Sequence, residues 1–368
     1  MSSVAGNVAG LSACLLFGLP FMVGKEKKHI FAYHFQMTSM YQYSKTEAIR
    51  RMNSLSEAGR EFIFIIDYEQ QRAYVEEACK VDSRECLFDF GGIGNAESHS
   101  SGRAGDVTWK IYPPSFDEYS SSFNIVRNHI MAGNSYLVNL TFRVAVETNL
   151  TTREIFTVSN APYRLWMKDR FVCFSPETFV RIGSDGRMSS YPMKGTIDPT
   201  LPDAHNRLMS DMKEAAEHAT VVDLIRNDLS MVADRVNVAR YRYCERIATN
   251  KGAILQTSSE ITGMLPAGYP SHIGDIIFSQ LPAGSITGAP KQKTCGIISE
   301  AETYRRGFYT GVMGRCDGRS LDSAVMIRFV EQDADGRLFY KAGGGITSKS
   351  DAESEYKELI QKIYVPFC

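Results

Sequence analysis

The chain has 368 residues, of which 43% are hydrophobic and 23% are charged, and its formal net charge is −1. This composition predicts a soluble globular protein with a large core, built as one big domain or two smaller ones. The balanced charge gives no indication of a nucleic-acid or membrane partner. The eight cysteines are scattered, with no CxxC pair and no Cys/His cluster. They favour reduced thiols in a cytoplasmic protein over a disulfide framework or a zinc site.

An apolar stretch near the amino terminus, Leu11 to Gly24, is too short to span a bilayer comfortably. No Lys or Arg precedes it, so the basic start of a signal peptide is missing. The charged run Lys25 to Lys28 leaves a weak membrane anchor open as an alternative. The preferred interpretation is that residues 1–36 are an extension outside the fold, with Met37 or Met40 as the true start.

Hydrophobic periodicity predicts the elements that follow. In chain order they are a helix over 44–59, a strand over 61–67, loops within 68–110, a helix over 115–133, a strand over 137–146, two strands over 171–182 and 187–193 around a turn at 183–186, a helix over 208–225 and a last helix over 351–363. Hairpins beside long helices indicate an α+β fold and not a regular βαβ array.

Lys194 lies in the pentapeptide Pro192 to Thr196, just after a short alternating run. Proline fixes φ, and Gly195 permits conformations that other residues avoid, so the backbone beside the lysine is sharply defined. A lysine held in a pocket and partly desolvated loses its proton more easily and can act as a nucleophile. A surface turn with an ordinary solvated lysine is the alternative that the pentapeptide leaves open.

Glu177 follows Ser175 and Pro176 near the start of one strand, and Lys194 lies just beyond the end of the other. Because a tight turn brings the far ends of two strands together, both side chains are expected to share one pocket. A carboxyl beside an amine can serve as general acid while the amine attacks. The alternative is a cross-strand salt bridge of little energetic weight.

Three glutamates form a second candidate group. Glu217 precedes the segment Val222 to Asp228 on one helix, and Glu355 and Glu358 are three residues apart on the last helix, so they face the same way. Carboxylates from distant segments can bind Mg²⁺, which takes oxygen ligands and keeps waters that a substrate carboxylate can replace. Glutamates on helices are also common as solvated faces, so both interpretations stay open.

Two segments rich in glycine and small hydroxyl residues, 282–291 and 343–348, can expose backbone N–H groups that hold anions. They match neither the GxxxxGK[ST] phosphate loop nor GxGxxG, so nucleotide binding is not supported. Arg328 lies within the apolar run 324–330. An arginine in such a run is either structurally paired or a carboxylate clamp.

Together these segments resemble the chorismate-utilising enzymes. Within that family they are most similar to the aminodeoxychorismate synthase component I type, which carries lysine where anthranilate, isochorismate and salicylate synthases have Pro-x-Ala-Gly-Thr. The matching blocks run in family order from about residue 113 to the end of the chain: Tyr136 to Leu140, Ser175 to Glu177, Pro192 to Thr196, Asp223 to Asp228, Gly284 to Lys291, Tyr309 to Gly311, Arg328, Gly343 to Gly345, and Glu355 to Glu358.

The resemblance implies a covalent mechanism for chorismate amination. Lys194 would attack C2 while the C4 hydroxyl leaves, Glu177 would protonate that hydroxyl, and ammonia would enter at C4 and expel the lysine. The product would be 4-amino-4-deoxychorismate, for para-aminobenzoate and folate synthesis. The other implied site residues are Glu217 and Glu358 with Glu355 nearby for Mg²⁺ and the ring carboxylate, Arg328, Tyr309 and the backbone of Gly343, Gly344 and Gly345 for the enolpyruvyl carboxylate, and Thr287 and Lys291 lining the site.

The implied fold is an α+β sandwich of two large, mostly antiparallel sheets, with helices outside and the site between them. Residues 113–368 would form the chorismate-binding core. Residues 37–112 would form a first part shorter than usual for the family, so no complete tryptophan pocket is expected. Gln256 replaces the family's histidine three residues before a serine, here Ser259. In anthranilate synthases that histidine is associated with pyruvate loss, so its absence fits a protein that stops at aminodeoxychorismate, although glutamine could also merely fill the space.

No glutamine amidotransferase signature is recognised in the chain; the bare Gly-x-Cys-x-Gly spacing occurs once, at Gly314 to Gly318 around Cys316, and it does not by itself define such a signature. Ammonia is therefore expected from solution or from a separate glutamine amidotransferase subunit, component II. Two rival interpretations remain. One is an anthranilate or isochorismate synthase that carries lysine, which product identity would reveal. The other is a silent subunit that only binds a partner or chorismate, against which the presence of Lys194, Glu177 and the three glutamates argues.

Overall fold

The computed structural model describes residues 40–96, 107–249 and 252–366. The extension expected at residues 1–36 lies outside this part of the chain. The first of two sheets has ten described strands. In spatial order they are β1 (Gln42–Tyr43), β3 (Ala73–Glu77), β2 (Phe62–Ile66), β16 (Val312–Cys316), β17 (Leu321–Val325), β10 (Thr178–Ile182), β11 (Arg187–Ser190), β14 (Gly252–Met264) and β12 (Met193–Ile197), with β13 (Asp234–Thr249) paired to β14.

The second sheet has nine described strands. In spatial order they are β15 (Gly288–Ala289), β7 (Leu137–Thr148), β19 (Leu338–Ile346), β18 (Phe329–Gln332), β9 (Phe171–Ser175), β8 (Tyr163–Met167), β4 (Cys86–Phe90) and β5 (Ile93–Gly94), with β6 (Trp109–Tyr112) paired to β7. In both sheets, every pairing between described strands is antiparallel.

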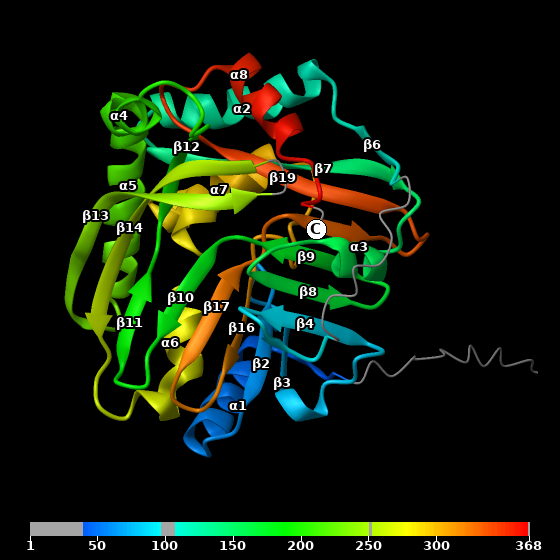
Figure 1. Cartoon of the computed structure of the whole chain (residues 1–368), viewed down its shortest axis with the longest axis vertical. Coiled ribbons are helices and arrows are strands. Elements are labelled where there is room, and N and C mark those ends of the chain that lie inside the picture. The colour runs from blue at the N-terminus through cyan, green and yellow to red at the C-terminus, as the bar shows by residue number, and fades with distance from the viewer. Residues whose placement is uncertain (1–39, 97–106, 250–251, 367–368) are drawn as a thin grey trace, which may run out of the picture. The chain divides into compact units, whose positions relative to one another are not determined.

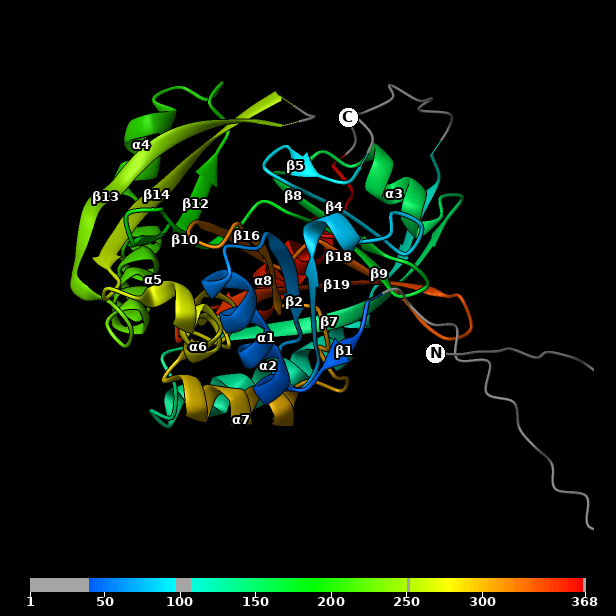
Figure 2. The ribbon, with the colours of Figure 1, turned by 90° about the horizontal axis from the view of Figure 1, so that it is seen from below.

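Helices lie along the outer faces of the sheets (Figure 1). With the first sheet lie α1 (Lys45–Glu57), α4 (Ala204–Ser210), α5 (Met212–Leu229), α6 (Ile273–Ser279) and the short turns η1 (Ala78–Lys80), η2 (Tyr269–His272) and η3 (Gly284–Ile286). With the second sheet lie α2 (Phe116–Met131), α3 (Thr152–Val158), α7 (Lys291–Ala301) and α8 (Ala352–Gln361). Figure 2 shows α7 and α2 side by side, in agreement with their packing.

The core between the two sheets explains why several strands are apolar throughout. In β2, Ile63 and Ile65 belong to the hydrophobic cluster shared with the second sheet, whereas Phe62, Phe64 and Ile66 belong to the cluster under the helices of the first. Successive side chains of a strand point to opposite faces, so a strand buried on both faces loses its polar alternation. The α+β sandwich of two large antiparallel sheets expected from the sequence is confirmed.

Local sequence signals explain most of the helices. Ser115 and Glu118 form the expected capping box at the start of α2, with the serine hydroxyl accepting from the Glu118 N–H at 3.2 Å. The helix expected over 208–225 is two helices, α4 and α5, separated at Asp211. The expectation of loops for 68–110 is wrong in part, because β3, β4, β5 and β6 lie there.

The strand expected over 171–182 is also wrong. It is two strands, β9 and β10, and they lie in different sheets. The chain changes sheet at Pro176 and Glu177, where proline has no N–H to continue a ladder. Pro192 separates β11 from β12, which pair one after the other with the same edge of β14, while β13 pairs with its other edge.

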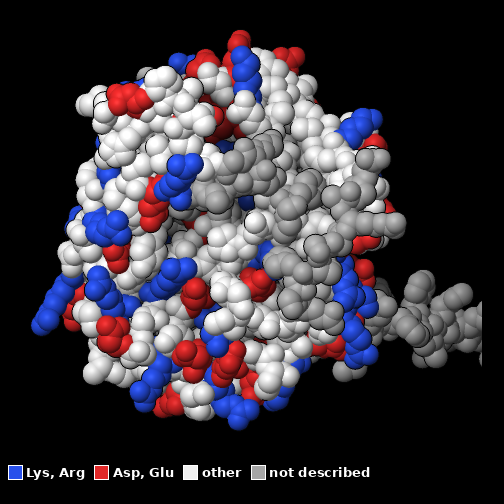
Figure 3. All heavy atoms as spheres, viewed as in Figure 1, with Lys and Arg blue, Asp and Glu red and all other residues white. Residues whose placement is uncertain are grey.

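Charged side chains show no single-sign patch on the face in Figure 3, where basic and acidic groups are mixed. This distribution matches the formal net charge of −1. Within the described residues, no helix is long and apolar enough to cross a membrane.

Candidate active site

Two chain segments cross from one sheet to the other side by side, and they carry two of the candidate residues. Glu177 lies between β9 and β10, and Arg328 lies between β17 and β18. β10 pairs with β17 in the first sheet and β9 with β18 in the second. Backbone bonds continue the pairing across the junction, since the N–H of Val325 donates to the Glu177 carbonyl at 3.1 Å and that of Phe174 to the Arg328 carbonyl at 3.1 Å.

The carboxyl of Glu177 is buried, which is the kind of environment that suits a proton donor. Burial raises its pKa above the usual value, although the hydrogen bond from Ser285 and the charges of Arg328 and Lys362 oppose that rise. The Ser285 hydroxyl donates to Glu177 Oε1 at 2.6 Å. A carboxyl with a raised pKa keeps its proton closer to neutral pH, which suits a general acid.

Arg328 is held in an unusual conformation at this junction. Its φ is 53°, a region that residues other than glycine seldom adopt. One guanidinium nitrogen donates to the Lys362 carbonyl at 3.2 Å, and the guanidinium lies 5.0 Å from the centre of the Tyr364 ring. Strained backbone of this kind concentrates at functional sites. The arginine is thus oriented by the end of α8 and lies within electrostatic range of Glu177.

Lys194 lies in β12 and forms an ion pair with Glu217 of α5, with 2.8 Å between Nζ and Oε2. Desolvation by itself would lower the pKa of Lys194, but Glu217, Glu214 and Glu358 raise it above its usual value. The sequence-based expectation of an amine that loses its proton easily is therefore not met in this state. The lysine is neither a solvated surface residue nor a neutral amine, because its side chain is 31% exposed and paired.

Glycine at position 195 lets the chain bring Lys194 to α5. Its φ is 77°, and the pairing of β12 with β14 shifts register between Lys194 and Thr196. A Cβ at this position would lie 3.1 Å from Glu214 Oε2. Any other residue would therefore meet both an unfavourable φ and a crowded carboxylate.

Glu177 and Lys194 line different cavities. Lys194 lines a cavity of about 220 Å³ together with Glu217 and residues of β7 and the loop after β19. Glu177 lines a smaller one of about 20 Å³. The expected hairpin around residues 183–186 is formed by β10 and β11, but Lys194 lies beyond Pro192 in β12, which pairs with β14 and not with β10. The end of α8 influences both residues. The charge of Lys362 lowers the pKa of Glu177, and the charge of Glu358 raises the pKa of Lys194.

The three candidate metal ligands lie on two helices. Glu358 forms an ion pair with Lys362 at 2.7 Å, and Glu355 accepts from the Ser350 hydroxyl at 2.8 Å. A Cβ built on Gly344 would lie 3.6 Å from Glu355 Oε2 and 3.9 Å from Glu358 Oε1, so both carboxylates face this glycine. Among the residues that the structure describes, no three Asp, Glu, His or Cys side chains form a group that could hold a metal ion. Carboxylate oxygens are the type of ligand that Mg²⁺ prefers. The third glutamate, Glu217, is paired with Lys194.

The glycine segment 343–345 lies in β19, opposite Thr141, Leu140 and Asn139 of β7. The Lys362 ammonium donates to the Gly343 carbonyl at 3.0 Å. Tyr309, expected at the same carboxylate, is 3% exposed and packs against Phe329 in the core between the sheets, with 5.9 Å between ring centres. Its burial raises the pKa of the phenol well above its usual value.

The remaining candidates, Thr287 and Lys291, belong to the loop before α7 and its first turn. The Thr287 hydroxyl is fully buried and donates to the Ala283 carbonyl at 2.8 Å. Lys291 forms an ion pair with Asp228 at 2.8 Å and donates to the Gln280 backbone carbonyl at 2.8 Å. Both side chains thus fix the loop that carries Ser285, the partner of Glu177.

Sequence reasoning missed a buried ion pair that ties this loop to β7. Arg306, 2% exposed, pairs with Glu302 at 2.6 Å and donates to the carbonyls of Ile286 at 2.9 Å and Asn139 at 2.6 Å. It also missed Lys362. Neither residue belongs to a recognisable spacing in the sequence, so only their contacts identify them.

Position 256, where the sequence departs from the family pattern, is buried beside β12. Gln256 is 8% exposed, pairs in register with Thr196, and its Nε2 has no hydrogen-bond partner among the described residues. The nearby histidine is His218 of α5, whose Nε2 lies 2.6 Å from the Ser259 hydroxyl. Burial lowers the pKa of His218 to about 4, so this ring is neutral near pH 7.

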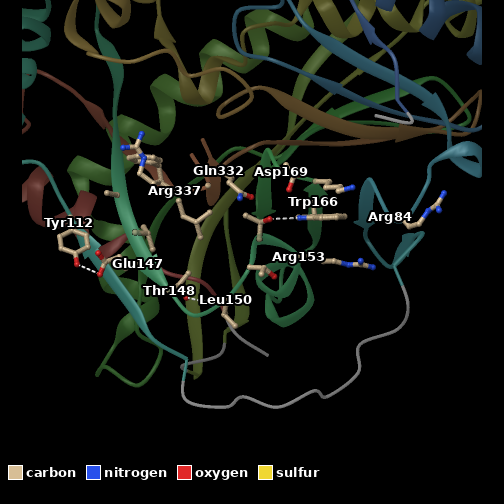
Figure 4. A pocket seen from close by; sticks show the side chains of 18 residues that line it. Arg84, Tyr112, Glu147, Thr148, Leu150, Arg153, Trp166, Asp169, Gln332 and Arg337 are labelled. Carbon is tan, nitrogen blue, oxygen red and sulfur yellow. Dashed lines mark hydrogen bonds between the residues drawn. The ribbon is translucent and has the colours of Figure 1, made fainter. Parts of the chain in front are cut away.

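A larger cavity of about 900 Å³ lies elsewhere, between the ends of β7, β8 and β18 and the start of β19 (Figure 4). None of the candidate residues lines it. Some of its polar groups are paired with one another: the Trp166 indole N–H donates to the Thr152 hydroxyl at 3.0 Å, and the Tyr112 hydroxyl donates to Glu147 at 2.5 Å. Among the described residues that line it, no buried side-chain nitrogen or oxygen lacks a hydrogen-bond partner.

The fold and the match to a family model define an enzyme class. The family model described as chorismate binding enzyme matches residues 30–367, and the chain belongs to this family. Two relatives match nearly their whole length. The chain is 45% identical over 327 residues to an "Uncharacterized PabA-like protein" of Haemophilus influenzae, which covers 89% of this chain and 98% of that protein. It is 47% identical over 318 residues to a similarly named protein of Pasteurella multocida, over 86% and 98%.

A more distant relative bears the name of an activity. The chain is 31% identical over 263 residues to aminodeoxychorismate synthase component 1 of Escherichia coli, covering 67% of this chain and 56% of that protein. Among solved structures, the menaquinone-specific isochorismate synthase MenF of Escherichia coli superposes with a TM-score of 0.69 at 16% identity, over 88% and 82% of the two chains. Anthranilate synthase component I of Streptococcus pneumoniae gives 0.61 at 21%, over 82% and 79%. These structural likenesses show the fold.

Proposed function

We propose that this chorismate-binding enzyme is an aminodeoxychorismate synthase component I, which converts chorismate and ammonia to 4-amino-4-deoxychorismate. The observation that carries the proposal is the position of Lys194, whose ammonium lines a cavity and is held by a carboxylate in a member of the chorismate-binding family. The relationship to aminodeoxychorismate synthase component 1 of Escherichia coli supports the same activity. The pathway to para-aminobenzoate and folate follows from this product.

In the proposed mechanism, Lys194 is the nucleophile. Its amine must be neutral to attack. The carboxylate of Glu217, 2.8 Å from Nζ, is the proposed acceptor of its proton. The amine forms a bond to C2 of chorismate while the C4–O bond breaks. Ammonia then forms a bond to C4, and the bond from C2 to the lysine breaks. This second displacement restores the original arrangement of double bonds in the ring. Two displacements replace one difficult substitution.

Glu177 is the proposed general acid. Its raised pKa keeps the carboxyl protonated closer to neutral pH, so it can give a proton to the C4 hydroxyl as that group leaves as water. Ser285, which donates to Glu177 at 2.6 Å, fixes the orientation of the carboxyl. Arg328 and Lys362, the cations nearest to Glu177, are placed to bind substrate carboxylates.

Glu217, Glu355 and Glu358 are the residues that would hold Mg²⁺, which supplies positive charge for the ring carboxylate. In the described conformation Lys194 and Lys362 neutralise two of these carboxylates. The enolpyruvyl carboxylate would meet Arg328, Tyr309 and the backbone of Gly343 to Gly345. Thr287 and Lys291 shape the wall of the site. The ammonia comes from solution or from a separate amidotransferase subunit.

Product analysis tests the proposal. The purified chain is incubated with chorismate, Mg²⁺ and excess ammonium at mildly alkaline pH, and products are identified by mass and chromatography. We expect aminodeoxychorismate, which an added lyase converts to para-aminobenzoate. Anthranilate or isochorismate would instead assign the rival synthase activity, for which the 30% identity to an anthranilate synthase component 1 of Haloarcula marismortui is the supporting observation. Chorismate binding without turnover, even after addition of amidotransferase and glutamine, would identify a silent subunit.

A further inference from the structure

We propose that the small cavity beside Glu177 is the binding site of the ammonia molecule that attacks C4. This inference rests on the proposed amination of chorismate. The cavity has a volume of about 20 Å³. That is room for about one molecule of the size of water. The polar groups of its lining include the side chains of Glu177, Asp228, Gln280 and Ser285.

An unsatisfied buried acceptor indicates that this cavity holds a donor. Gln280 is 1% exposed, and its Oε1 accepts no hydrogen bond from any residue that the structure describes. Its amide nitrogen donates to the Ser279 hydroxyl at 3.3 Å, which identifies the other end as the free acceptor. Leaving such a group without a donor costs about 1–3 kcal/mol. Buried polar atoms of this kind are normally satisfied by a bound molecule.

The second acceptor, Asp228, is built into the site. Its side chain is 9% exposed, and its Oδ2 forms the ion pair with Lys291. Lys291 also holds the backbone carbonyl of Gln280, so one lysine fixes both acceptor residues. A Cβ on Gly284 would lie 2.9 Å from Asp228 Oδ2, so only glycine leaves room for this carboxylate. This gives a role to the segment Asp223 to Asp228, which the proposed mechanism does not use.

The chemistry of the lining selects ammonia. Gln280 and the two carboxyl groups offer acceptors. Among the lining hydroxyl groups, Ser285 already donates to Glu177, Ser190 donates to the Phe179 carbonyl, and Thr178 is bonded to Tyr163. Ammonia brings three N–H donors, against two O–H donors for water. The rest of the wall includes the buried side chains of Phe179, Ile225 and Leu229, which disfavour a charged ammonium ion.

The position of the cavity also fits the reaction. Glu177, which lines it, is the group proposed to protonate the departing C4 hydroxyl. Ammonia held against Glu177 would approach C4 from the side that the hydroxyl has just left. The amine would then take the place of the hydroxyl with its position retained, as the double displacement requires.

The first test compares the dependence of turnover on ammonium chloride in variants of Gln280. Gln280→Leu removes the acceptor with a side chain of similar size. We expect the KM for ammonia to rise roughly tenfold, which corresponds to the loss of one hydrogen bond. The KM for chorismate should not change. Gln280→Glu keeps an acceptor oxygen and should stay near the wild type. Gln332→Leu, the same change at a glutamine that lines the separate cavity of Figure 4, is the matched control. Equal ammonia KM values for the wild type and folded Gln280→Leu would overturn the proposal.

The second test uses methylamine as a larger nucleophile. The wild-type cavity excludes it, whereas Gln280→Ala enlarges the cavity and should yield a product one CH₂ heavier than aminodeoxychorismate. A merely structural role of Gln280 does not predict this gain. Methylamine use by the wild type equal to its ammonia use would contradict the site. If the wild type aminates chorismate and only these variant effects fail, the ammonia site alone is wrong. If the wild type forms no aminodeoxychorismate, the proposed function and the site fall together.

Discussion

Lys194 and Glu177 show how neighbours decide the protonation of a buried group. Desolvation acts on both, but Lys194 has a carboxylate 2.8 Å from its ammonium, so its pKa rises. Glu177 has a neutral hydroxyl as its close partner and cations farther away, so the burial effect dominates and its pKa also rises. The pKa values of both residues are therefore raised before substrate binds, which favours their protonated forms. This state suits an acid directly and a nucleophile only after proton transfer.

Lys194→Ala removes the proposed nucleophile. We expect amination to fall by roughly three orders of magnitude or more, with chorismate binding largely kept, because the lysine contributes mainly after binding. Single-turnover product formation and a chorismate titration measure the two effects. Lys349→Ala, which changes another lysine lining the same cavity, is the matched control and should keep near wild-type turnover. Unchanged turnover in Lys194→Ala would remove the nucleophile assignment.

Glu177 sets the expected pH dependence. Its pKa is raised, so the carboxyl is protonated at low pH and loses the proton as pH rises through this raised value. The step that needs an acid should therefore slow on the alkaline side when free ammonia is kept constant. Glu177→Gln should lower kcat by about 10²–10⁴-fold and remove this alkaline limb. Glu147→Gln, at the distant cavity, should retain the wild-type profile. An alkaline limb that persists in Glu177→Gln would assign it to another group.

At the scale of elements, the site depends on strands that change sheet or are interrupted at a proline. β9 and β10 are continuous in sequence but belong to different sheets, and the same is true of β17 and β18. Their junctions place Glu177 and Arg328 where the sheets meet. β12 in turn continues along the edge of β14 with which β11 pairs, and β13 pairs with the opposite edge. The interruptions at Pro176 and Pro192 are local, but the destinations of the strands depend on partners far away in the sequence.

Gly195→Ala tests the backbone that delivers Lys194. With φ at 77° and a Cβ only 3.1 Å from Glu214, we expect a loss of about 1–3 kcal/mol in the free energy of unfolding. Urea denaturation measures it. Gly296→Ala is the control, because that glycine lies inside α7 with open space at its Cβ. It should stabilise the protein by up to about 1 kcal/mol. Equal stability of both variants would show that the strain at position 195 is relieved elsewhere.

Glu358→Gln tests the metal role of α8. We expect Mg²⁺ binding, measured by calorimetry without substrate, to weaken at least roughly tenfold, equivalent to about 1.4 kcal/mol. The amount of chorismate needed for half-maximal rate should rise with it. Glu353→Gln is the matched control on the same helix, where Glu353 pairs with Lys357 at 4.0 Å. An unaltered Mg²⁺ titration of Glu358→Gln would place the metal elsewhere.

At the scale of the whole molecule, the two sheets enclose a core that fixes the junction, and the proposed reaction needs a source of nitrogen. The described chain brings together the candidate residues for chorismate chemistry. Its one Gly-x-Cys-x-Gly spacing, around Cys316, is not a strand-to-helix nucleophile elbow, because Cys316 ends β16 and the chain turns back into β17. The proposed partner is therefore a glutamine amidotransferase subunit.

The isolated chain should aminate chorismate with ammonium and not with glutamine. Addition of an amidotransferase subunit should confer glutamine-dependent product formation, measured as the ratio of rates with the two nitrogen sources at equal chorismate. The control is the same mixture with the catalytic cysteine of the amidotransferase blocked, which should retain only the ammonium rate. Tight glutamine-dependent activity of the isolated chain would contradict a separate partner.

The sequence by itself determined the elements whose signals are local. The capping box at Ser115, the apolar run of β2 and the helix that carries Glu355 and Glu358 follow from neighbouring residues, and the ordered blocks identified the family. Only the tertiary structure decided that Glu177 and Lys194 lie in separate cavities, that Glu217 holds Lys194, and that Gln280 and Asp228 face the same small space. The physical reason is that capping and periodicity act over a few residues. Sheet order, ion pairs and cavities depend on contacts between segments far apart in the chain.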